Sequence, residues 1–478
     1  MQTGTFLENQ AVMIEGSHFA GVRPEDEYGG KDEATWIDAG GGYLIPGLTD
    51  GHVHLDVGAG NRPDFGDGPL YLASGITTVF NMRGDKEHLR WRDRVREGEL
   101  LGPSIYSCGE FINEPYVKTP EDVRREVLAQ KNAGFDFLKF HEYWDHDLRR
   151  YLTREGLSGE AYWALIDAAA SANMPLTGHG PNHFQLALEH GQSFAHLNVL
   201  LECALLPENK PAYRRNGFLA QWSLAVLVLA SMVAFIGRRK PLDGLVVLAA
   251  AFVLYVFFEV FWSMNDGVIY ALLGLPSVSV VSSLPAGVQG LFLRYWKYRI
   301  LALLQFVAGV GLIVSMSFWV PLFLKNTNSG VDRLIAPLGR QSTPVVTTMV
   351  VDTPEWFSAE HPDFKYIQSK TAKQWRALDM GSTSFWQRFL AGDLKVKNWH
   401  PILMKLVKKM DDAGAVLVLG TDAMGFPAVV PGESALYELG LMVEAGLSPF
   451  AALKTATLNP PKLVWQEGVF GIIAFGQL

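Results

Sequence analysis

Short apolar segments alternate with helix-forming segments along most of the chain, and this alternation restricts its fold more than any other feature. The apolar segments have the length and the β-branched or aromatic content of buried strands. Stretches with helical spacing lie between them, for example residues 120–134 and 159–172. The eight strand candidates are the segment leading to His52 and residues 77–80, 104–108, 137–141, 175–179, 193–196, 344–348 and 416–422. Eight strands that alternate with helices predict an α/β fold, the TIM (β/α)8 barrel.

The first strand candidate ends in two histidines one residue apart, His52 and His54. The period of two along a strand puts both side chains on the same face, with Val53 turned the other way. Two neighbouring imidazoles at a strand end are a good start for a metal site. For a His-x-His pattern alone, two ordinary polar residues at a strand end are an equally good interpretation.

The surrounding run PGLTDGHVH at residues 46–54 favours the metal site. It resembles the first metal-binding strand of the amidohydrolase superfamily, in the imidazolonepropionase and prolidase-like branch. Polar residues also end the later strands, where catalytic residues of barrel enzymes lie. They are Lys139 on the fourth strand, His179 after the fifth, His196 after the sixth and Asp422 after the eighth. This order matches the amidohydrolase pattern.

The resemblance implies a site with two divalent metal ions, usually zinc. His52, His54 and Asp422 would hold one ion, His179 and His196 would hold the other, and Lys139 would bridge them as a carbamate. An ammonium group cannot bind a metal, whereas a carbamate is an anion with two oxygen ligands. Taken singly, each residue has a structural alternative: a core histidine for His179 or His196, an ion pair for Lys139 and a helix cap for Asp422.

The implied chemistry is the hydrolysis of a C–N bond, in an amide or a dipeptide, by a metal-activated water molecule. Asp422 would accept the proton of that water and deliver it to the leaving amine. A deaminase or a lactonase on the same scaffold is the alternative within enzymes. The alternative outside enzymes is a membrane scaffold or binding protein without catalysis.

Further polar residues stand next to the proposed ligands and are candidates for contacts with the substrate. His141 shares a strand face with Lys139, so it is an alternative ligand or a substrate contact. His183 and Tyr143 lie in the following loops as rim candidates. Asn81 and Arg83 follow the second strand and are weaker candidates.

Charge and composition exclude some classes of protein and suggest another. The net charge of −8 and the absence of a Lys/Arg-rich run argue against a nucleic-acid partner. Residues 219–237, 245–264 and 300–324 are each long and almost free of charge, and residues 268–293 are uncharged but broken by prolines. Each of the first three is long enough to cross a bilayer, and residues 268–293 are either a broken span or a re-entrant segment. They predict an inserted α-helical transmembrane bundle and a multi-pass membrane protein, with membrane lipid as a partner and an amide or amphipathic small molecule as substrate.

The expected domain organisation combines these observations. We expect a partial N-terminal β-sandwich at residues 1–45, with strands at 11–15 and 43–45, and barrel strands one to six at residues 46–209. The transmembrane insert of about four helices occupies residues 210–325, and barrel strands seven and eight with the closing helices occupy residues 326–465. Residues 466–478 resemble the start of a truncated return to the sandwich, as in a fragment. The side of the membrane that holds the barrel is left open.

Overall fold

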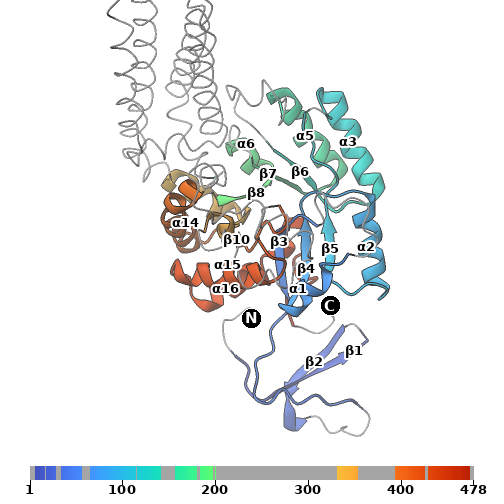
Figure 1. The fold of residues 1–478 in the computed structure, drawn as a ribbon, viewed down its shortest axis with the longest axis vertical. Helices are drawn as coiled ribbons and strands as arrows, with labels where there is room; N and C mark the ends of the chain where they lie inside the picture. The colour runs from blue at the N-terminus through green and yellow to red at the C-terminus, as the bar shows by residue number, and fades with distance from the viewer. Residues whose placement is uncertain are drawn as a thin grey trace, which may run out of the picture. The chain divides into compact units, whose positions relative to one another are not determined.

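The computed structural model describes residues 6–16, 18–27, 34–55, 65–114, 116–141, 157–179, 184–197, 200, 331–353, 393–425 and 429–473. The chain forms two compact units. The first unit comprises residues 1–142, 156–200 and 335–478, and it contains all the strands of the described part of the chain (Figure 1). The second unit comprises residues 143–155 and 201–334.

Eight parallel strands form the centre of the first unit, and they are the eight that the sequence predicts. They are β3 (Leu48–Val53), β4 (Ile76–Asn81), β5 (Ser104–Ser107), β6 (Leu138–Phe140), β7 (Leu176–Gly178), β8 (Ser193–Ala195), β9 (Pro344–Val346) and β10 (Val416–Val418). Hydrogen bonds order them as β3-β4-β5 and as β10-β9-β8-β7-β6. Every strand pair in these two sheets is parallel.

Backbone hydrogen bonds join the two sheets on both sides. At one seam, Gly51 N donates to Leu419 O at 2.8 Å and His54 N donates to Ala423 O at 2.9 Å. At the other seam, Asp136 N donates to Ser107 O at 2.8 Å, and Ile112 N donates to Lys139 O at 3.0 Å. The eight strands therefore close into one barrel, as the alternation of strands and helices predicts.

Helices connect the strands and cover the barrel. They are α1 (Gly68–Ala73), α2 (Lys86–Arg96), α3 (Pro120–Ala133), α5 (Gly159–Ala172), α6 (Phe184–Glu189), α14 (Asp393–Asp412), α15 (Glu433–Glu444) and α16 (Pro449–Ala456), with the short 3-10 turns η1 (Glu25–Glu27), η2 (Met349–Asp352) and η5 (Pro460–Val464). Thr119 and Asp122 form a capping box that begins α3, and Gly134 ends the helix in the left-handed conformation. The predicted helices at 120–134 and 159–172 are confirmed as α3 and α5.

The N-terminal residues form a two-stranded antiparallel hairpin. It pairs β1 (Gln10–Glu15) with β2 (His18–Pro24). The predicted strand at residues 11–15 is confirmed, but the predicted strand at 43–45 is wrong, since these residues have no regular structure. Tyr43 and Leu44 are 78 % and 60 % exposed. A strand needs a hydrogen-bonded neighbour, and within the described ranges none pairs with this segment. The sandwich and the other domain boundaries stay predictions.

Membrane crossing is the main point on which the sequence interpretation needs correction. Across the described ranges, no helix has both the length and the apolar character that crossing a bilayer requires. This finding contradicts the predicted multi-pass localisation, and the transmembrane bundle and the membrane-lipid partner that depended on it have no support among the described residues. The prediction relied on runs of uncharged residues, which indicate apolar sequence rather than a spanning helix. Those runs, at residues 219–324, lie outside the described residues.

Candidate metal centre

Three predicted ligands meet where β3 adjoins the chain that follows β10. The Nε2 atom of His54 lies 2.9 Å from Asp422 Oδ1, and the Nε2 atom of His52 lies 3.5 Å from the same oxygen. One ligand atom from each of the three residues lies within 4.8 Å of the others. His52 and Asp422 are buried, and His54 is only slightly exposed. This group could hold a metal ion, because neutral imidazoles and a carboxylate are zinc ligands.

A buried carboxylate holds the two ligand-bearing segments together. Asp50 accepts hydrogen bonds from His52 N and Thr421 N, both at 3.1 Å, and from Thr421 Oγ1 at 2.6 Å. Directly beside these bonds, Asp422 N donates to His52 O at 2.7 Å. Burial raises the pKa of Asp50 to about 7, and the hydrogen bonds from Thr421 and His52 oppose that rise. Asp50 thus ties the first metal-binding segment to the last.

His196 and His179 complete an imidazole cluster. The ring of His196 lies 4.6 Å from that of His52 and 5.0 Å from that of His179, measured between centroids. His196 Nδ1 lies 4.0 Å from Asp422 Oδ2 and 2.8 Å from the hydroxyl of Thr348. Both His196 and Asp422 have left-handed backbone, with φ of 71° and 60°. The backbone therefore turns at His196, directly after β8, and at Asp422, four residues beyond the end of β10, and their side chains lie in one site.

Lys139 lies in the middle of β6 and is 1 % exposed. Burial lowers its pKa to about 8, although Cys108 and Asp422 act in the opposite direction. Lys139 interacts electrostatically with His52, His179 and Asp422, so the fourth-strand lysine belongs to the same cluster.

The buried nitrogen atoms of this cluster fit a bound cation. Three buried nitrogen atoms have no hydrogen-bond partner among the described residues: Lys139 Nζ, His52 Nδ1 and His179 Nε2. Burial, together with the neighbouring basic groups, lowers the pKa values of His52 and His179 well below the usual range. Both imidazoles are therefore neutral at physiological pH, which is the form that binds a metal. Burying polar atoms without partners is costly, and metal coordination would remove that cost.

Aromatic side chains form the wall beside the histidines. The His141 ring stacks on His179 at 4.2 Å and also contacts the Phe111 ring at 4.4 Å. Phe111 also meets His54 edge-on, while the Arg83 guanidinium lies over the Phe111 ring. His141 is thus beside the site, as expected for either a ligand or a substrate contact. Of the other rim candidates, His183 and Tyr143 lie outside the described residues.

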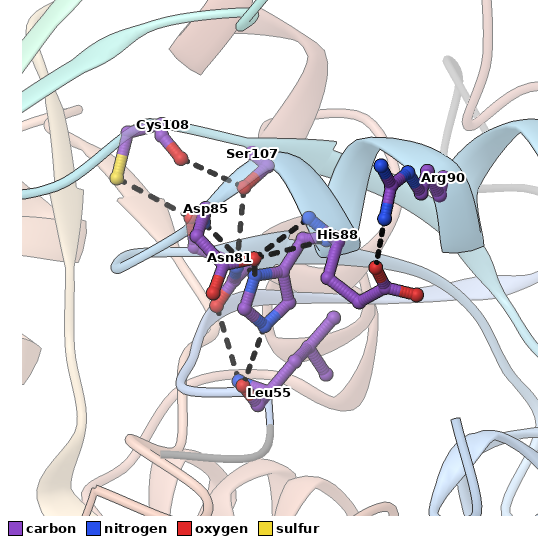
Figure 2. Close-up of polar contacts among 8 residues, drawn as sticks. Leu55, Asn81, Asp85, His88, Arg90, Ser107 and Cys108 are labelled. Atoms are coloured by element: carbon purple, nitrogen blue, oxygen red, sulfur yellow. Dashed lines mark hydrogen bonds and ion pairs between the residues drawn. The ribbon is translucent and has the colours of Figure 1, made fainter. Parts of the chain in front are cut away.

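Asn81 and His88 support the chain directly after the His-x-His pair (Figure 2). Asn81 Oδ1 accepts a hydrogen bond from Leu55 N at 3.1 Å, and His88 Nε2 lies 2.8 Å from Leu55 O. Asn81 also donates to Ser107 Oγ. Asn81 is fully buried and holds the backbone near His54, while its role as a substrate contact stays a prediction.

Sequence reasoning missed three residues that shape the site. Thr348 contacts His196, Phe111 lines the wall, and Glu438 lies behind the turn that carries Thr348. The position of Thr348 at the end of the seventh strand was an available signal. The sequence holds no such signal for Phe111 or Glu438. An apolar residue in a loop and a glutamate in a helix are common in any protein, and only the folded structure shows their contacts.

Sequence comparison connects part of the chain to adenine deaminases. The chain is 35 % identical over 177 residues to an adenine deaminase of Chelativorans sp. (strain BNC1), a match that covers 36 % of this chain and 29 % of that protein. It is 26 % identical over 203 residues to an adenine deaminase of Rubrobacter xylanophilus, covering 33 % of each. The matched regions thus span about a third of these relatives. No protein-family model matches the chain.

Solved structures resemble the chain over nearly all its length. A prolidase in complex with N-methylphosphonate-L-proline superposes with a TM-score of 0.53 at 15 % identity, covering 100 % of this chain and 88 % of that one. A bottromycin amidohydrolase has a TM-score of 0.53 at 15 % identity, with 97 % and 76 % covered. Molinate hydrolase has a TM-score of 0.52 at 15 % identity, with 99 % and 84 % covered. The chain therefore has an amidohydrolase-like fold.

Proposed function

We propose that this chain is a metal-dependent hydrolase that acts on a C–N bond of a small molecule, with an amide or a dipeptide as substrate. One observation carries the proposal: four histidines, a lysine and an aspartate from different strands gather at the carboxyl end of one barrel. They are His52, His54, His179, His196, Lys139 and Asp422. The likeness to amidohydrolase structures adds support, since active sites of this fold lie at that end.

We assign the residues to two divalent cation positions, with zinc as the expected metal. His52, His54 and Asp422 would hold one ion, and His179 and His196 would hold the other. Lys139 would serve both positions as the carbamate that its amine forms with carbon dioxide, which fits a buried amine without a described hydrogen-bond partner. When bound, such ions lower the pKa of a water molecule and polarise the carbonyl group of a substrate.

The protein's own groups then position the substrate and move the proton. Asp422 lies beside both His52 and His54, where its carboxylate accepts the proton of the attacking water and passes it to the leaving amine. The wall formed by His141 and Phe111 orients the substrate. The partly exposed pair of Arg83 and Glu110 next to Phe111 adds polar groups for recognition.

A deaminase is the second candidate, and the adenine deaminase relatives favour it. Both reactions break a C–N bond with water, so the same metal centre suits either. They differ in the leaving group: an amidohydrolase releases an amine, whereas a deaminase releases ammonia.

Metal analysis combined with a substrate screen tests the proposal. We expect two ions per chain in the purified protein, and hydrolysis of members of a panel containing N-acyl amino acids, Xaa-Pro dipeptides and adenine. Assays for amine and ammonia identify the reaction. His54→Ala should lose metal and activity, whereas His190→Ala, which changes an exposed histidine outside the cluster, should keep both. A protein that binds less than one ion, or activity unchanged in His54→Ala, would overturn the proposal.

A further inference from the structure

The turn that ends β9 has an unfavourable backbone conformation. Thr348 has a φ of 52°, in the left-handed region that β-branched residues avoid. The 3-10 turn η2 begins directly after it, and the Thr348 side chain does not cap this turn. Such a conformation persists only where the surroundings fix it.

Glu438 of α15 fixes the conformation of this turn through hydrogen bonds. Its buried carboxylate accepts hydrogen bonds from Thr347 Oγ1 at 2.5 Å, Met349 N at 2.9 Å and Val350 N at 2.7 Å. These donors flank Thr348 on both sides. The hydrogen bonds of Glu438 go to the turn rather than to the metal centre.

The fixed residue in turn contacts a candidate metal ligand. Thr348 Oγ1 lies 2.8 Å from His196 Nδ1, and His196 N donates to Val346 O at 3.0 Å. The hydrogen bond at one ring nitrogen of a histidine decides which tautomer it adopts and which nitrogen is free for a metal. If Nδ1–H donates to Thr348, the lone pair of Nε2 is left for coordination.

We infer that Glu438 is a positioning residue for His196: through Thr348 it holds the imidazole in the Nδ1–H tautomer and aims Nε2 at the second metal position. The metal-binding part of this inference rests on the proposed function, whereas the tautomer of His196 does not depend on it. Glu438 touches neither substrate nor metal in this role. Its effect reaches the site only through the turn at Thr348.

Metal binding by a variant series at pH 8 gives the first test. Glu438→Gln places an amide NH2 among backbone donors, and Thr348→Val removes the hydroxyl. For both we expect the Kd of the more weakly held ion to rise about 10- to 100-fold. Thr348→Ser keeps the hydroxyl and should restore binding. We expect kcat to fall more than KM changes, because the substrate wall at His141 and Phe111 is untouched.

A structural control separates positioning from lost stability. Ser434→Ala removes a buried hydroxyl on the same helix, which donates its hydrogen bond to Val430 O rather than to the turn. It should lower the melting temperature and leave metal affinity unchanged. If Glu438→Gln lowers the melting temperature and leaves metal affinity unchanged as Ser434→Ala does, the inference is wrong.

The tautomer of His196 gives a second test that needs no metal. In metal-free protein labelled with 15N-histidine, the ring shifts of His196, assigned with His196→Gln, should show Nδ1–H in the wild type and a mixture in Glu438→Gln. If the wild type binds no metal, the proposed function fails while this spectrum still decides the inference. Identical His196 shifts in the wild type and Glu438→Gln would overturn it.

Discussion

Thr49 of β3 and Thr421 beyond β10 are both buried, but only the Thr421 hydroxyl has a hydrogen-bond partner among the described residues. It donates to the Asp50 carboxylate, a bond that closes the barrel at the candidate site, and it accepts from Ala423 N at 3.0 Å. Thr421→Val should lower the free energy of unfolding by about 1–3 kcal/mol, because the buried carboxylate loses a donor. Urea denaturation measures the change.

Thr49→Val is the matched control for that experiment. It makes the same isosteric change in the neighbouring strand, at a hydroxyl without a described partner. We expect its free energy of unfolding to equal or slightly exceed that of the wild type. Equal losses in the two variants would contradict the assigned role of the Asp50 bond.

His88 connects α2 to the backbone after the His-x-His pair. Its Nε2 bonds to Leu55 O, and its Nδ1 accepts from Asp85 N (Figure 2). His88→Leu should cost about 1–3 kcal/mol of unfolding free energy and should weaken metal binding, because the chain next to His54 loses an anchor. Calorimetry and metal titration check both effects.

Arg90 on the same helix is the comparison residue. Its ion pair with Glu87 is exposed and local, so Arg90→Ala should change the free energy of unfolding by less than about 0.5 kcal/mol. Metal affinity should not change. A His88 variant that behaved like the Arg90 variant would show that Leu55 does not need the His88 bond in addition to that of Asn81.

Metal addition should stabilise the chain strongly. Chelator-treated protein keeps several buried nitrogens without described partners, and a bound ion satisfies them. At a free zinc concentration of 100 times Kd, the gain in unfolding free energy is about 2.7 kcal/mol for one site. Scanning calorimetry should show this gain in the wild type and in His190→Ala, with a smaller gain in Asp422→Asn. No shift in the wild type would contradict the metal assignment.

Glu438 should make stability depend on pH. Burial raises its pKa from 4.5 to about 7, against the opposing effect of its hydrogen bonds with Thr347, Met349 and Val350. Between these values the native chain keeps a proton that the unfolded chain has released. The native state therefore binds more protons there, and stability falls as pH rises from 4.5 to about 7.

The Glu438→Gln variant isolates this effect, since its amide side chain would not titrate while Asp50 titrates in both proteins. We expect the wild-type advantage over Glu438→Gln in unfolding free energy to shrink by at most about 3 kcal/mol between about pH 4 and pH 8. Urea titrations across this range measure it. A constant difference would mean that Glu438 ionises in the folded chain at the same pH as in the unfolded one.

The order of strands and the main candidates for the site were predictable because both depend on local patterns. A buried strand is a short apolar run, and the residue that ends it lies at the rim of the barrel. This reasoning yields His52, His54, Lys139, His179, His196 and Asp422 as candidates. The structure brings all of them into one cluster, while their roles as ligands stay a proposal.

The supporting residues could not be found by this reasoning, because their roles depend on contacts between distant segments. Glu438 follows Thr347 by 91 positions, and Thr421 follows Asp50 by 371. A glutamate on an amphipathic helix is usually a solvent-facing residue, and only the packed fold shows that this one is buried. The wrong strand at 43–45 has the same origin, since strand formation depends on a neighbour that the local sequence does not specify.

At His196 and Asp422, the residue that the proposed function needs is not the residue that the left-handed backbone favours. An L-residue in this conformation costs about 1 kcal/mol relative to glycine. Glycine would relieve that strain at both strand ends, but it would remove an imidazole and a carboxylate from the candidate site. Their presence in this chain is thus a cost that folding alone does not explain.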